Sequence, residues 1–438
     1  MSIKSNQNQR AILINGVLWA IYDSFTSVFL AAFALALGAN NTVVGILGSL
    51  PFVALVLAEI PGAKLVEFLP RKVIYVIFSS FSRASWLLLL LVPYLFKSNP
   101  IAFVSVFYFV GKFFEWLTDP SWTSLVADIV PTKIRGEFFG LRQAGIAFAG
   151  MIALVLGGLY LDIFPKGRFI GFSSLFAVGL VFGLASVVAF SRVREPTYRD
   201  HDHHKLKDFF SLKGELRKFM LIMALFNFAV FLASPLFTVY MLRNLGMSYT
   251  FYAAAAALST LVKILSYKRL GRIADRYGNK PVAFLSMFGT ALVPLSFIFI
   301  TPTNRWLVVP AQILSGIVWA GMDITSFTLL LELTSAKRRA VEVAEFQIIT
   351  TLPIIAASIL GGWIADNLVF VLSGIPLVFA LAFLLRLISA LCLLKVSAVA
   401  QKKSGTIVEV LKEIAIDPIK GLQNRLYVFS KRIVRLTV

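Results

Sequence analysis

Twelve long apolar segments recur along the 438-residue chain, separated by short polar or Gly/Pro-containing turns. Segments of about 20 apolar residues can cross the hydrocarbon core of a bilayer. Lipid cannot hydrogen-bond to free backbone groups, so such runs must be helices, and their continuous pattern argues against a β-barrel. The sequence predicts an all-α polytopic membrane protein. The expected spans are 11–37, 42–62, 72–95, 101–129, 138–161, 169–192, 217–242, 250–268, 281–301, 306–333, 342–365 and 369–396.

The composition excludes several other classes of protein. Hydrophobic residues make up 58% of the chain and charged residues 15%, which is too little charge for a soluble enzyme of this length or for a disordered chain. The single cysteine, Cys392, has no intrachain partner, and the three histidines share one polar segment. We therefore expect no metal, no cofactor and no catalytic residues. A phosphate-binding loop is also missing, which argues against ATP-driven transport by this chain alone.

The excess of basic residues predicts the topology of the chain. In a soluble protein, 42 Lys and Arg against 22 Asp and Glu would suggest a nucleic-acid partner. If the N-terminus is cytoplasmic, most of these cations fall in cytoplasmic segments, as is typical of membrane proteins. We therefore expect a cytoplasmic membrane protein of a prokaryote with both termini inside and no nucleic-acid partner. The loops on the other side carry only Lys97, Lys166, Arg168, Arg243 and Arg305.

The longest interior polar stretch follows the sixth span and is expected to link two six-helix halves. In the tail, apolar residues from Ile407 to Ile416 have partly helical spacing, which is compatible with an amphipathic helix on the membrane surface. Anionic lipid headgroups are the expected partner of the basic tail. The expected division is an N-tail 1–10, a first bundle 11–192, a linker 193–216, a second bundle 217–396 and a basic tail 397–438.

The two halves repeat each other. An offset of 208 residues aligns Ala63–Lys72 with Gly271–Lys280, and an offset of 204 aligns Asp119–Gln143 with Asp323–Gln347. Charged positions coincide in both alignments, in the same loop of each half. The chain is therefore predicted to be a duplicated unit that forms two pseudo-symmetric six-helix bundles, which is one of the architectures of transporters.

One repeated segment resembles a known signature. GRIADRYGNK, after the eighth span, resembles the pattern between the second and third helices of each half in the major facilitator superfamily (MFS). The turn Pro131–Gly136 resembles the loop after the family's fourth helix. The resemblance covers about residues 11–396 and implies the MFS fold, a cavity between the halves and alternating access. The first-half copy of the signature, AKLVEFLPRK, departs from the pattern at Ala63, Glu67, Phe68 and Pro70.

The signature also implies a charge latch at the cytoplasmic gate, formed by Asp275 with Arg272 and Arg276. A carboxylate and a guanidinium pair well when they are partly desolvated, so such a pair can hold one state of the gate. The alternative is that these loops are solvated turns with ordinary topogenic charges. The expected gating residues are Lys64, Glu67, Arg71, Arg135, Gly271, Arg272, Asp275, Arg276, Gly278, Lys280 and Arg339.

Ionisable residues inside the spans are candidates for the transport site, because a charge at mid-bilayer costs about 2.5–3.5 kcal/mol. In the fourth span, Lys112, Glu115 and Asp119 are spaced to share one helix face. The family's cavity is lined by helices one, four, seven and ten. Arg83 and Arg386 lie on other helices and are expected to pair with neighbours or to snorkel. The expected substrate- or proton-binding residues are Asp23, Lys112, Glu115, Trp116, Asp119, Asn227, Trp319 and Asp323.

These candidates allow more than one interpretation. A carboxylate in a poorly hydrated cavity can bind and release a proton, whereas Lys112 could also simply neutralise Glu115. We expect a monomeric secondary transporter for a small organic solute, with proton-coupled export of an apolar or cationic compound. The alternatives are an uptake permease or facilitator for a sugar or organic ion and, from other classes, a non-transporting receptor or a membrane-embedded enzyme.

The latch can be tested with Asp275→Asn, which removes the charge and keeps the shape of the side chain. Transport into proteoliposomes should fall, while the variant is still extracted from membranes as a folded protein. Normal transport by this variant would contradict the latch.

Overall fold

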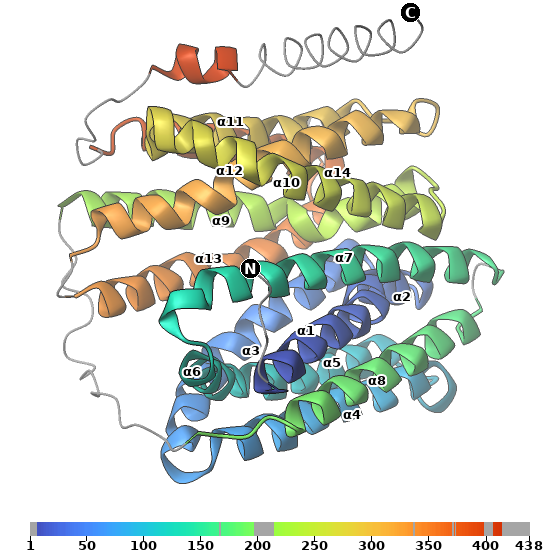
Figure 1. The fold of residues 1–438 in the computed structure, drawn as a ribbon. Helices are drawn as coiled ribbons and strands as arrows, with labels where there is room; N and C mark the ends of the chain where they lie inside the picture. The colour runs from blue at the N-terminus through green and yellow to red at the C-terminus, as the bar shows by residue number, and fades with distance from the viewer. Residues whose placement is uncertain are drawn as a thin grey trace, which may run out of the picture.

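The computed structural model describes residues 7–165, 168–196, 214–335, 338–369, 372, 374–397 and 406–413. These residues contain twelve helical spans that are long and apolar enough to cross a membrane (Figure 1), which confirms the predicted all-α fold. Nine spans are α3 (Asn41–Phe68), α4 (Arg71–Leu95), α7 (Arg135–Asp162), α8 (Ile170–Ser191), α10 (Tyr249–Tyr277), α11 (Asn279–Ile298), α12 (Val308–Leu333), α13 (Arg339–Asn367) and α14 (Ile375–Leu393).

The other three spans are interrupted helices. The first is α1 (Gln7–Phe25) followed by α2 (Leu30–Ala36), and the fourth is α5 (Pro100–Leu117) followed by α6 (Asp119–Ile129). The seventh is α9 (Gly214–Val239), which ends in a π-helical turn. The fourth span breaks at Thr118, next to Pro120, which has no backbone N–H and is favoured in the first turn of a new helix. Asp119 therefore begins α6 instead of continuing the helix that carries Glu115.

The spans form two bundles, α1–α8 and α9–α14, as expected from the repeat. Within the first bundle α1 packs against α7 and α8, and within the second α10 packs against α12 and α9 against α13 and α14. The bundles meet where α3 packs against α13 and α7 against α10 (Figure 1). Most of the expected linker, with the three histidines, and most of the tail lie outside the described residues.

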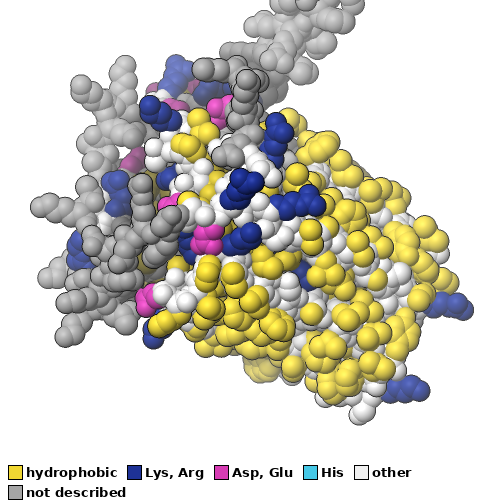
Figure 2. Space-filling model, turned by 60° about the horizontal axis from the view of Figure 1, so that its bottom comes forward, with side chains coloured by type: hydrophobic (Ala, Val, Ile, Leu, Met, Phe, Trp, Pro, Cys, Tyr) yellow, Lys and Arg dark blue, Asp and Glu magenta, His cyan; other side chains and the backbone are white. Residues whose placement is uncertain are grey.

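Charged side chains gather on one side of the molecule in Figure 2, next to an apolar surface. We call the end at which α8 finishes and α9 begins the linker end, and the opposite end the far end.

A short helix over 407–413 lies at the linker end, where Val410 is fully buried against Leu270, Ala274 and Val282. This part of the expected amphipathic helix thus packs on protein. Ile414 and Ile416 lie outside the described residues.

The two bundles approach closely at the far end. A Cβ added to Gly158 of α7 would lie 2.7 Å from the Tyr249 carbonyl oxygen and 2.8 Å from the Cβ of Ala253 in α10. Gly362 of α13, which is related to Gly158 by the 204-residue offset, lies equally tight against Thr42 of α3. One apolar core runs across both bundles here, whereas at the linker end each bundle has a core of its own. The bundles are therefore joined at the far end.

Two repeat-related carboxylates reinforce this junction. Asp162, the last residue of α7, accepts hydrogen bonds from the backbone N–H groups of Tyr249 (2.9 Å) and Thr250 (2.8 Å) at the start of α10. Asp366, near the end of α13, accepts hydrogen bonds from the backbone N–H groups of Asn41 (3.3 Å) and Thr42 (2.7 Å) at the start of α3. A carboxylate there satisfies unpaired donors and interacts favourably with the helix dipole. Each bundle thus caps a helix of the other.

The double variant Asp162→Asn/Asp366→Asn should open the far end more often, because each cap contributes about 0.3–2 kcal/mol. The measurement is the distance between spin labels at Ile170→Cys and Phe299→Cys in a Cys392→Ser background. A longer-distance population should appear or grow. Glu137→Gln, an exposed carboxylate of α7 at the linker end, is the matched control. Unchanged distances in the double variant would contradict the role of the caps.

Candidate functional site

The first bundle encloses a cavity of about 580 Å³, lined by α1, α3, α4, α5, α6 and α7. This volume is in the range of pockets that take small organic ligands. Five of the candidates from the sequence line it, namely Asp23, Lys112, Glu115, Trp116 and Asp119. The structure therefore brings the N-terminal candidates together in one site.

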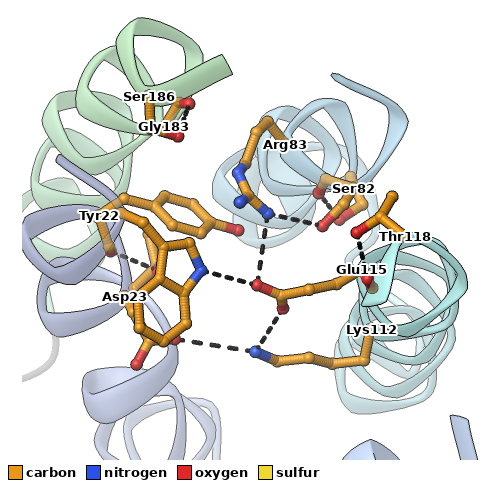
Figure 3. Close-up of polar contacts among 12 residues, drawn as sticks. Tyr22, Asp23, Ser82, Arg83, Lys112, Glu115, Thr118, Gly183 and Ser186 are labelled. Carbon is orange, nitrogen blue, oxygen red and sulfur yellow. Dashed lines mark hydrogen bonds and ion pairs between the residues drawn. The ribbon is translucent and has the colours of Figure 1, made fainter. Parts of the chain in front are cut away.

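Glu115 is the centre of a buried polar network (Figure 3). Its carboxylate accepts hydrogen bonds from Trp19 Nε1 of α1 (2.9 Å) and Lys112 Nζ of α5 (2.8 Å), and lies 3.5 Å from an Arg83 nitrogen of α4. Lys112 also lies 3.7 Å from Asp23 of α1. The contact between Lys112 and Glu115 that the sequence suggested is thus present, but it belongs to a network that ties three helices together.

Arg83 pairs with a neighbour, as expected, but its place differs from expectation. Its helix was expected to lie outside the cavity, yet the side chain is 2% exposed, lines the cavity and pairs with Glu115. Its guanidinium lies 4.4 Å from the centre of the Tyr22 ring. The small residue Gly183 of α8 leaves room for it, since a Cβ there would lie 3.1 Å from Arg83 Cδ. The burial of Arg83 depends on this neighbour, which is far away in the sequence.

Asp119 lies in the same cavity but outside this network. Among the described residues it forms no ion pair, and the Thr123 hydroxyl is its hydrogen-bond partner. Glu59 of α3 is exposed and lies close enough to Asp119 for the two carboxylates to repel each other. Glu59 was missed as a candidate, although a carboxylate inside the span 42–62 was the signal that could have revealed it.

Arg142 is a second residue that sequence reasoning missed. By sequence it counts among the basic residues of the cytoplasmic side, because it stands close to the start of a span. The structure places it on α7 in the wall of the cavity, with its guanidinium carbon 4.6 Å from the centre of the Trp122 ring. Among the described residues it forms no ion pair, unlike Arg83 and Lys112.

The candidates of the second bundle are not part of this cavity. Asp323 of α12 accepts a hydrogen bond from the Tyr267 hydroxyl (2.6 Å) and lies 3.2 Å from Lys263 Nζ, both on α10. Asn227 donates to the Thr350 carbonyl (3.2 Å), and Trp319 packs against a phenylalanine. The repeat-related carboxylates Asp119 and Asp323 thus differ, because only Asp323 has an ion-pair partner in the described part of the chain.

Arg386 also lies outside the cavity. It is buried in the second bundle, where it donates to the carbonyls of Thr290 (2.8 Å) and Val230 (3.4 Å). It therefore has neighbouring partners, as expected for a cation on this helix.

Among the expected gating residues, Arg71 has the most contacts. It is 1% exposed and lies 2.6 Å from Asp128 at the end of α6 and 3.1 Å from Glu195 after α8. In the second bundle the related positions are Asn279 and Glu332, and the Asn279 amide donates to the Glu332 carboxylate (2.6 Å). A polar link between the same two spans is therefore repeated at the linker end of both bundles.

The proposed latch residues of the second bundle are not paired with one another. Asp275 is exposed and forms no ion pair in the part of the chain that is described. Arg272 donates to the Lys268 carbonyl (3.4 Å), and Arg276 lies 3.5 Å from Glu413 of the tail. The latch stays a prediction.

The other expected gating residues lie singly at the linker end. Arg135 donates to the Ala127 carbonyl (2.9 Å), Lys280 to the Leu394 carbonyl (2.8 Å) and Arg339 to the Thr334 hydroxyl (3.4 Å). Gly278 ends α10 with a φ of +93°, which favours glycine. Lys64 and Glu67 are exposed on α3, and Gly271 lies within α10.

Comparisons with known proteins agree with this architecture. A family model described as Major Facilitator Superfamily matches residues 12–232 and 219–432. An MFS-type transporter of Methanocaldococcus jannaschii is 24% identical over 307 residues, which cover 68% of this chain and 77% of that protein. A bacterial homologue of the iron transporter ferroportin, solved in an inward-facing state, has a TM-score of 0.70 at 15% identity over 90% of this chain and 99% of its own. A D-xylose-proton symporter has a TM-score of 0.69 at 14% identity, and the match covers 91% of this chain and 99% of the symporter.

Arg83→Met should destabilise the protein by about 3–5 kcal/mol, because it leaves a buried network of two carboxylates, Asp23 and Glu115, with Lys112 as its one cation. The measurement is the free energy of unfolding in detergent. The double variant Arg83→Met/Glu115→Met should recover part of the loss, since Lys112 and Asp23 remain as a pair. Lys218→Met, which breaks the surface pair with Glu215, should cost less than about 1 kcal/mol. Equal effects of Arg83→Met and Lys218→Met would contradict this account.

Proposed function

The chain belongs to the major facilitator superfamily and is a multi-pass membrane transporter, and from this premise we propose that it moves an organic ion through the cavity of the first bundle together with a proton. Its relatives and structural neighbours named above are transporters. The observation that carries the proposal is the carboxylate of Asp119, which forms no ion pair among the described residues, in a cavity whose other carboxylates each lie near a cation.

Alternating access is supported by the contrast between the two ends. The hydrogen bonds between the bundles that are described lie at the far end, where Asp162 and Asp366 make their caps and Arg243 donates to the Ala39 carbonyl. At the linker end the apolar cores of the bundles are separate. With the linker in the cytoplasm, as the basic loops predict, this is an inward-open state. Transport then requires the far-end contacts to break and the linker ends to meet.

Asp119 is the proposed proton site. Glu115 accepts hydrogen bonds from Trp19 and Lys112 and forms an ion pair with Arg83. These interactions stabilise its ionised form. In the part of the chain that the structure describes, Asp119 forms no ion pair and lies near a second carboxylate, Glu59, so its charged form is less stabilised. A proton carried by Asp119 couples transport of the substrate to the pH gradient across the membrane.

The charges of the cavity bear on the choice between the two kinds of substrate suggested by the sequence. Export of an apolar or cationic compound was suggested by the acidic residues alone. The structure adds Arg83 and Arg142 to the wall of the same cavity, so cations are as numerous as carboxylates there. This balance favours the alternative of an organic ion. The protein acts as a monomer in the cytoplasmic membrane, with both termini inside.

Asp119→Asn should abolish accumulation driven by a pH gradient, because the side chain can no longer bind and release a proton. The assay uses proteoliposomes with an internal pH-sensitive dye and a panel of radiolabelled organic ions. Exchange of internal for external substrate should persist, since it needs no net proton movement. Asp323→Asn is the matched control, because its carboxylate lies outside this cavity and is paired. A gradient response of Asp119→Asn equal to that of the wild type would exclude Asp119 as the coupling site.

A further inference from the structure

We propose that Arg142 is the anion-binding group of this cavity, and that the substrate is an organic anion with a carboxylate or phosphate next to a flat apolar body. This inference rests on the proposed function, since it assumes that the substrate enters the same cavity. It names the chemical class of substrate, which neither the family nor the relatives determine.

Among the described residues, Arg142 is the cation of this cavity that forms no ion pair with a carboxylate. Six charged side chains line the space, and four of them form the network around Glu115. Of the remaining two, Asp119 is the proposed proton site and Arg142 carries a positive charge. The Nε atom of Arg142 is buried without a hydrogen-bond partner among the described residues. The Arg142 side chain is half-buried, so its charge is partly desolvated and is stabilised when an anion pairs with it. A bound anion would supply that partner.

The surroundings of Arg142 hold its guanidinium in place. The guanidinium carbon lies 4.6 Å from the centre of the Trp122 ring. The neighbouring helix α1 presents Gly16, where a Cβ would lie 3.1 Å from Arg142 Nε. A guanidinium fixed in this way keeps its planar set of donors available for two parallel hydrogen bonds to a carboxylate or phosphate.

Tyr75 offers a second donor in the same cavity. Its hydroxyl oxygen accepts a hydrogen bond from the Asn15 amide (3.0 Å), which also donates to the Ser186 carbonyl (3.0 Å). The Tyr75 hydroxyl keeps its own proton for donation, and Tyr75 lines the cavity together with Arg142. A guanidinium with a neighbouring hydroxyl is suited to an oxyanion.

The rest of the wall favours a flat apolar body. Trp19, Trp116 and Trp122 all line the cavity, and indole rings supply large apolar surfaces for stacking. The indole N–H of Trp19 is already bonded to Glu115, so its ring face remains for the ligand. A proton on Asp119 would balance the charge of a monoanion, which makes their joint movement electrically neutral.

The test measures equilibrium binding to the purified full-length protein in detergent at pH 7 by isothermal titration calorimetry. The probes are indole-3-acetate, indole-3-acetamide and tryptamine, which share one ring system and differ in charge, together with 1-naphthyl phosphate and tryptophan. Both anions should bind at least tenfold more tightly than the amide and tryptamine. Arg142→Gln should remove this preference, Arg142→Lys should keep part of it, and the control Arg168→Gln, an exposed far-end residue, should leave it unchanged.

Several results would overturn the inference. One is tighter binding of tryptamine or of the amide than of the anions. Another is tighter binding of tryptophan than of both anions, which would indicate a zwitterionic substrate. A third is that neither anion binds at millimolar concentration. An unchanged anion preference in a folded Arg142→Gln variant, with unfolding temperature as the check, would also overturn it. Because binding needs no pH gradient, anion preference without gradient-driven transport would contradict the proposed coupling and leave this inference standing. Proton-coupled transport of a cation would support the proposed coupling and overturn the inference that the substrate is an anion.

Discussion

Desolvation of charge is the constraint on which this structure depends. Arg83, Lys112 and Glu115 lie inside a protein that is itself surrounded by lipid, so each charge needs a partner that three different helices must supply. The network around Glu115 therefore fixes the relative positions of α1, α4 and α5, and with them the shape of the cavity. The two charged groups outside the network, Asp119 and Arg142, are the ones to which we assign the proton and the substrate anion in our proposals.

Much of the fold could be predicted from the sequence, for a physical reason. Apolar length reports directly on membrane spans, because a bilayer leaves few alternatives to a helix. All twelve spans, their grouping in two bundles and the family were predicted on that basis and from the GRIADRYGNK signature. The break at Thr118 was harder to predict, because a proline within a span, such as Pro120, can either kink a helix or start a new one.

The site was only partly predictable. Asp23, Lys112, Glu115 and Asp119 were found because charges within spans are rare. Their partners could not be deduced, since the contact of Arg83 with Glu115 depends on how α4 rotates against α8 at Gly183. Arg142 was missed because a basic residue near the start of a span can equally be one of the topogenic charges of the preceding cytoplasmic loop. Positive charge at the cytoplasmic side is thus an ambiguous signal, because topology and substrate binding use the same residues there.

The reciprocal caps at the far end have a consequence for how the transporter opens. Asp162 and Asp366 belong to opposite bundles, and each holds the first turn of a helix in the other. A rigid rotation that separates the bundles lengthens both contacts at the same moment, so neither can be lost while the other is kept. The two caps, which are equivalent under the 204-residue offset, are therefore lost together when this end opens, along with the contact between Arg243 and the Ala39 carbonyl.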